Sequence, residues 1–73
     1  MYKTKDFYFA TVLKALGYKI ESYDRNGKVF DFIFDLKEDD AKTIYTSYIN
    51  DELIVKAKSF TESINLLKTI VNS

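Results

Sequence analysis

The chain has 73 residues with eleven basic and eleven acidic side chains, so its formal net charge at pH 7 is zero. It has no cysteine and no histidine, which excludes disulfides, thiolate metal sites and the commonest general base. A domain of this size buries only about 60% of its unfolded surface, and 47% hydrophobic residues predict one dense core in a single domain over residues 1–73.

The first predicted element is a helix over residues 5–16. Thr4 is the expected N-cap, and Gly17 is the expected left-handed residue that ends the helix. The apolar positions recur with the spacing of one helical face, at Phe9, Val12, Leu13 and Leu16.

A hairpin follows, with strands over residues 18–24 and 28–35. In the second strand Phe30, Phe32 and Phe34 alternate, so they share one face. A two-residue Asn-Gly turn pairs Glu21 with Phe32, whereas a three-residue loop over 25–27 pairs Ile20 with Phe32. We prefer the three-residue loop because it buries an apolar side chain.

Residues 40–49 are predicted to form a second helix, capped by Asp39 or Asp40. The same stretch is rich in β-branched and aromatic residues, so a strand is the alternative. The helical spacing favours the helix, with apolar positions at Ala41, Ile44, Tyr45 and Tyr48.

Alternating residues predict a short third strand over 52–57. A capping box at Ser59 and Glu62 then starts a helix over residues 60–71. Its apolar face contains Phe60, Ile64, Leu67 and Val71.

These elements predict an α+β fold in the order α-β-β-α-β-α, with a three-stranded sheet and helices packed on one face. The other face of the sheet is then free to meet a partner. Residues 31–55 carry seven acidic and two basic groups, a net charge of −5. We therefore expect a protein partner, a second copy of the chain included, at Tyr23, Asp31, Ile33, Asp35, Asp39, Asp40 and Ile54. An ordinary solvated strand face and a helix N-terminus also account for these carboxylates.

No catalytic residue, metal ligand set or cofactor motif is predicted. The two glycines are used in a helix end and a turn, so no phosphate-binding loop remains. The acidic residues lack the spacing of a calcium loop. We expect a protein that is not an enzyme.

Nucleic acid is the alternative partner, through Lys3, Lys5, Lys56 and Lys58. Double-stranded-RNA-binding domains have a similar order of elements, but the glycine and clustered lysines at their last helix are missing here. No segment has the length or apolarity of a membrane span or signal peptide, and the lack of cysteine is typical of a cytoplasmic protein.

Two stretches carry a family resemblance: residues 2–8 with 15–19, and residues 53–60 with Ile64, Leu67 and Lys68. They resemble a family of very small proteins of unknown function from low-GC Gram-positive bacteria, their phages and their mobile elements. The resemblance implies a phage-related cytoplasmic protein with a role in regulation or host interaction. It implies no catalytic residues. An inhibitor of host defence would fit a short domain that is acidic on one side.

Overall fold

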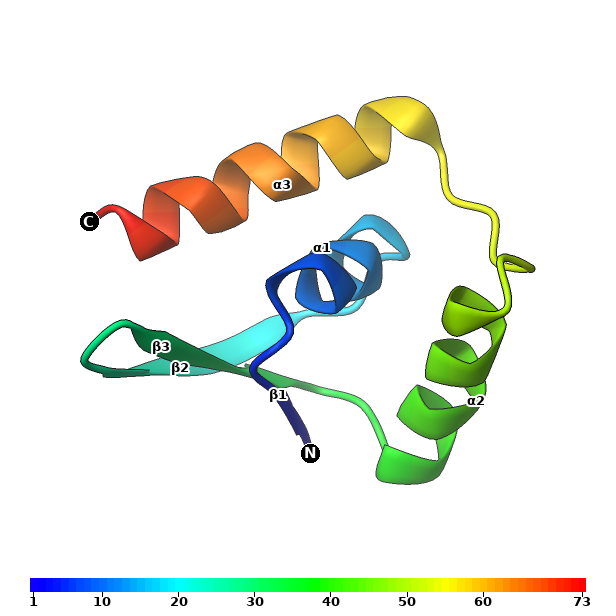
Figure 1. Cartoon of the computed structure of the whole chain (residues 1–73), viewed down its shortest axis with the longest axis horizontal. Coiled ribbons are helices and arrows are strands. Elements are labelled where there is room, and N and C mark those ends of the chain that lie inside the picture. The colour runs from blue at the N-terminus through cyan, green and yellow to red at the C-terminus, as the bar shows by residue number, and fades with distance from the viewer.

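A computed structural model describes all residues from Met1 to Ser73, and Figure 1 shows a three-stranded antiparallel sheet with three helices. The sheet order is β1-β3-β2, so β3 is central. The α+β class is therefore as predicted, while the order of elements differs. The elements are β1 (Tyr2–Thr4), α1 (Phe7–Ala15), β2 (Ile20–Asn26), β3 (Val29–Phe34), α2 (Glu38–Ile49) and α3 (Ala57–Val71).

The third strand of the sheet lies at residues 2–4, so its prediction at 52–57 is wrong. Residues 52–56 form an extended connection between α2 and α3. Leu53 and Val55 pack against the core while Ile54 is 88% exposed. Alternation therefore reflects extended backbone with one side against the core, which does not require a paired strand.

Asp6, and not Thr4, is the N-cap of α1. Its carboxylate accepts a hydrogen bond from the Phe9 N–H at 3.0 Å. Thr4 belongs to β1 and its hydroxyl accepts from the Asp6 N–H at 3.1 Å, so it holds the capping residue in place. The helix ends as predicted, because Gly17 has a φ of 101°.

The hairpin between β2 and β3 uses neither predicted register. Asn26 pairs with Val29 and Tyr23 pairs with Phe32, so the loop consists of Gly27 and Lys28. Gly27 has a φ of 64° and Lys28 has a negative one, which is the pattern of a type II′ turn.

A bulge at Glu21 directs Ile20, and not Glu21, towards the core, which is the result that the three-residue loop was predicted to give. The regular ladder from the turn would place Glu21 opposite Phe34 on the face that the helices cover. The ladder shifts between Ile20 and Ser22, and Ile20 pairs with Phe34 instead. Ile20 therefore packs against the core.

The second helix is confirmed, but neither it nor α3 has the predicted cap. Lys37 is the N-cap of α2 and Lys56 is that of α3, and neither side chain forms a capping hydrogen bond. Ser59 lies inside the first turn of α3, so the expected capping box with Glu62 does not form. Asp39 and Asp40 lie in the first turn of α2.

The core lies between the sheet and the helices. In Figure 1, α1 lies between the sheet and α3, whereas α2 stands at the side and the opposite face of the sheet is uncovered. The largest side chains that are fully buried are Phe9, Phe32, Phe34, Leu13 and Leu67. The alternation of phenylalanines in β3 and the stripes of α1 and α3 thus meet, as predicted.

Candidate binding site at the open edge of the sheet

The structure separates the residues that were expected to form one partner surface. Asp31 and Ile33 lie on the uncovered face of the sheet, as predicted. Tyr23 was expected on that face, but it pairs with Phe32 and lies on the helix face, 47% exposed. The bulge explains the difference, because side-chain alternation on one side of it is out of step with the other.

The remaining members of the expected surface lie outside the sheet. Ile54 is highly exposed in the connection after α2, Asp35 follows β3, and Asp39 and Asp40 lie on α2. All four side chains are exposed. They do not share a face with Ile33, so the single surface predicted from the alternation of 52–57 does not form.

Asp31 is buried although it lies on the uncovered face. Its residue is only 6% exposed, and its Oδ1 accepts no hydrogen bond. The Nζ of Lys5 lies 3.6 Å from that oxygen and supplies the balancing charge. Asp24 stands directly opposite on β2, where a like charge is unfavourable. Asp31 therefore serves an internal ion pair more than an exposed acidic surface.

The edge of β3 that faces β1 is only half occupied. β1 pairs with Phe32 to Phe34 and its ladder ends at Thr4. Because successive residues of an antiparallel strand direct their backbone groups to alternate sides, Phe30 turns its N–H and C=O away from β2. Phe30 thus presents one free donor and one free acceptor at the open edge.

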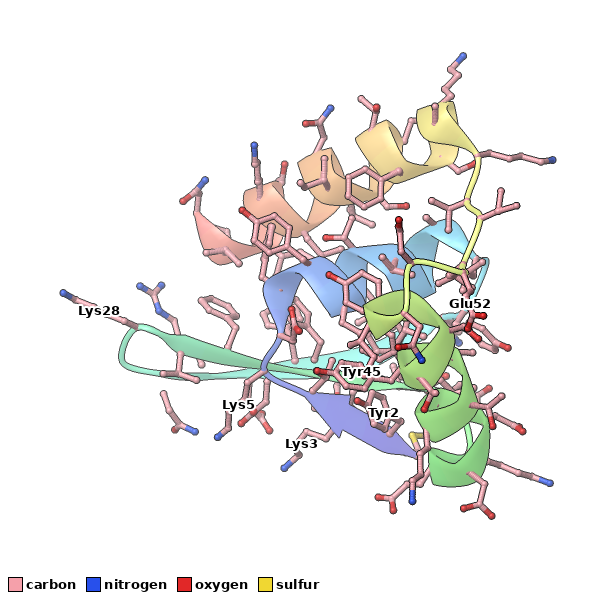
Figure 2. The ribbon with its side chains drawn as sticks, turned by 45° about the vertical axis from the view of Figure 1, so that its right-hand side comes forward. Tyr2, Lys3, Lys5, Lys28, Tyr45 and Glu52 are labelled. Carbon is pink, nitrogen blue, oxygen red and sulfur yellow. The ribbon has the colours of Figure 1, made fainter.

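A groove of about 270 Å³ lies at this open edge. Five of its seven lining residues are apolar and the other two are Lys5 and Lys28. Figure 2 shows Lys28 at the tip of the hairpin and Lys5 beyond the end of β1. The apolar lining comes from three elements and comprises Phe7, Val29, Phe30, Phe32 and Val71.

Sequence reasoning missed this groove. It joins residues from position 5 to position 71, and only the true position of β1 leaves half of β3 open. The one usable signal was the alternation at Tyr2 and Thr4 around Lys3, which is too short to tell a strand from a helix cap.

A second groove of about 500 Å³ lies between β1 and α2, and four of its six lining residues are charged. Tyr2 and Tyr45 contribute its aromatic surface, and Figure 2 shows the two side chains close together. Its charged residues have both signs: Lys3, Lys42, Glu38 and Asp39. Such mixed charge selects no single class of ligand.

Tyr48 lies beside this second groove in an aromatic cluster. Its ring centre is 5.4 Å from that of Phe9, and the ring of Tyr45 is 4.9 Å from Phe9. Burial raises the pKa of the Tyr48 hydroxyl above its ordinary value, and the negative charge of Asp6 adds to the rise. The Tyr48 hydroxyl therefore stays protonated to a higher pH than that of an exposed tyrosine. The contacts of Tyr45 and Tyr48 with Phe9 join α2 to α1.

The lysines of the predicted nucleic-acid site fall into two groups. Lys3 and Lys5 lie at β1, while Lys56 and Lys58 lie at the start of α3 on the other side of the molecule (Figures 1 and 2). Lys28 joins the first group instead. The three lysines near the β1–β3 edge form a basic row, which comprises Lys3, Lys5 and Lys28.

The fold and its surfaces define a small α+β domain with an open sheet edge. No group of three or more possible metal-ligating side chains comes together, and none of the helices has the length and apolar character needed to cross a bilayer. The chain belongs to the family described as Domain of unknown function (DUF5659), whose model matches residues 1–73. No curated protein and no solved structure matches it.

Proposed function

We propose that this protein is a non-enzymatic binding protein that acts by contact with another protein. The observation that supports the proposal is the apolar groove beside the free backbone groups of Phe30. An extended segment of the partner adds to the open edge of β3, with hydrogen bonds to Phe30 and an apolar side chain in the groove.

Charge selects the partner segment. Lys5 and Lys28 are the only charged residues that line the groove, so acidic residues that flank the apolar one are favoured. Lys5 keeps its ion pair with Asp31, which leaves Lys28 as the freer of the two. The partner class is therefore a protein with an exposed, extended and acidic segment.

The biological setting is part of the same proposal. The family resemblance supports a phage or mobile-element protein in the cytoplasm that inhibits a host defence or regulates a host protein. A domain this small can block the activity of a partner protein by binding one extended segment of it. Such binding requires only a short strand edge and no catalytic residues.

The test is an NMR titration of the isotopically labelled protein with a short capped peptide in which glutamates alternate with valine and leucine. We expect the largest amide shifts at Lys28, Val29, Phe30 and Asp31. A peptide of the same apolar residues with lysines in place of glutamates should bind at least about fivefold more weakly, because of repulsion at the groove.

A pair of matched variants locates the site. Lys28→Glu should weaken binding of the acidic peptide about fivefold, whereas Lys58→Glu, the same charge change on α3, should leave it unaltered. Equal effects of the two variants, or amide shifts confined to other elements, would rule out the groove as the site.

Nucleic acid is the second candidate partner, because the basic row of Lys3, Lys5 and Lys28 lies along one edge (Figure 2). A mobility shift with a single-stranded oligonucleotide at low salt tests it. Binding that falls steeply with salt and is lost in Lys3→Glu would support this candidate. The absence of any shift at low salt would eliminate it.

A further inference from the structure

The second edge of the sheet is entirely free. β2 is an edge strand of seven residues, and six of them are exposed. Because Asn26 pairs with Val29 next to the turn, alternate residues of β2 turn their backbone groups away from β3, Tyr23 and Arg25 among them. A long free edge of this kind is a template for another strand unless it is protected.

The sequence of β2 is complementary to itself. Tyr23 is its middle residue, with three residues on either side. In an antiparallel pair with its two-fold axis at Tyr23, Ser22, Tyr23 and Asp24 form the regular centre, and the bulge at Glu21 lies towards each end of the pair. Ser22 then lies opposite Asp24 of the second copy, and the bulged Glu21 falls beside Arg25 of the second copy, twice by symmetry.

Other antiparallel registers that use the same outward backbone groups are worse. An axis at Glu21, Asp24 or Arg25 places like charges opposite each other, which is unfavourable. An axis at Ser22 pairs fewer residues and places no opposite charges together. The register centred on Tyr23 is thus the one that matches both length and charge.

The charged side chains remain available for this pairing. Arg25 donates from Nε to the Gly27 carbonyl at 3.1 Å, and its guanidinium lies 5.4 Å from the centre of the Phe30 ring. These contacts leave its two terminal nitrogens free and hold the side chain in place. Glu21 has only the exposed Lys19 as an ion-pair partner, at 3.6 Å.

From this we propose that two copies of the chain associate through β2 into a two-fold symmetric dimer with one continuous six-stranded sheet. Assembly stops there, because the outer edges of the dimer are the short β1 and the half-open β3. The groove proposed as a partner site lies at those outer edges, so the dimer presents two grooves. The proposed dimer can therefore be disproved without affecting the proposed partner site, and the reverse is also true.

Sedimentation equilibrium of charge variants tests the pairing. Arg25→Glu and Glu21→Arg should each raise the dimer dissociation constant at least about tenfold, because each places like charges opposite each other. An equimolar mixture of the two should form a heterodimer within about threefold of the wild-type affinity, because both cross-strand pairs are then opposite in sign. Circular dichroism establishes that each variant is folded.

Single cysteines test the register, since the chain has none of its own. At position 23 the two Cα atoms across the axis are about 5.5 Å apart, a distance that suits a disulfide. Tyr23→Cys should cross-link on oxidation. Asn26→Cys is the control, because the two copies of that position lie about 20 Å apart. A wild-type monomer at all concentrations, a mixture that stays monomeric, or equal cross-linking of the two cysteine variants would overturn the proposal.

Discussion

Asp31 shows how one neighbour changes the role of a residue. Its place on the uncovered face was predicted, but as part of an exposed acidic surface. Lys5 lies at the next position beyond β1 and brings its ammonium group to the buried carboxylate. The energetic cost of breaking such an ion pair falls on the carboxylate, because only the carboxylate is removed from water.

Loss of the ammonium group should therefore destabilise the fold. We expect Lys5→Met to lower the free energy of unfolding by about 1 kcal/mol, since Asp31 is left buried without a balancing charge. Urea denaturation measures the change. Lys3→Met, an exposed lysine two residues earlier, is the control and should change stability by less than about 0.5 kcal/mol. Equal losses would show that the Lys5–Asp31 pair contributes nothing.

Tyr48 gives the fold a dependence on alkaline pH. Its pKa in the folded state is raised above the ordinary 10.0, by burial first and by Asp6 second. Stabilisation from the neutral hydroxyl is thus fully present below that value and is lost as pH rises through the folded-state pKa. The wild type should lose more stability than Tyr48→Phe between about pH 9 and pH 11.

Urea denaturation at several pH values measures this difference. Tyr23→Phe is the control, because Tyr23 lies half exposed on β2 and is not among the groups that act on Tyr48. Its pH dependence should follow that of the wild type. Parallel curves for all three proteins would contradict the assignment to Tyr48.

At the scale of elements, the helices and the central strand could be predicted from the sequence because each has a repeating apolar pattern. Phe30, Phe32 and Phe34 define β3, and the spacing around Leu13 and Leu67 defines α1 and α3. Of the two edge strands, β2 was predicted as a strand at 18–24 but in the wrong register, and β1 was not predicted. β1 is too short for a period, and the alternation at Leu53 to Val55 belongs to an extended connection.

The hairpin register and the groove were beyond sequence reasoning for a related reason. Both predicted registers assumed that one alternation runs through the whole of β2, and the bulge at Glu21 breaks that assumption. The groove depends on where β1 ends on β3, which is a tertiary pairing with no local signal. Local patterns indicate which residues are buried and do not indicate which strand edges stay open.

The connection between α2 and α3 offers a direct test of this distinction. Leu53→Ala should cost about 2 kcal/mol because it removes a side chain that packs against the core. Ile54→Ala should change stability by less than about 0.5 kcal/mol, since Ile54 lies in solvent. Thermal or urea denaturation of both variants makes the comparison. A similar cost at the two positions would favour a strand buried on both faces.

At the scale of the whole molecule, α2 is the least integrated element. Its one fully buried residue is Ala41, whereas α1 contributes Phe9 and Leu13 to the centre of the core. Figure 1 shows α2 at the side of the sheet, away from the stack of α1 and α3. An element with few buried apolar contacts opens locally more often than the rest.

Amide hydrogen exchange should show this order. We expect the amides of α2 to exchange at least about tenfold faster than those in the middle of α1, because local opening of α2 leaves the sheet and α1 intact. Mass spectrometry of peptic peptides resolves the two helices. Uniform protection across both would mean that the domain opens only as one cooperative unit.

The bulge at Glu21 has a consequence for how the molecule can change. On one side of it, odd-numbered residues of β2 face the helices, and on the other side Ile20 does. The register of the distal part of the hairpin is therefore independent of the position of Ile20, while Phe30 and Phe32 anchor that part in the core. The length and surface of this part can be remodelled in pairs of residues without disturbing Ile20, so new binding properties can be built there while the scaffold stays the same.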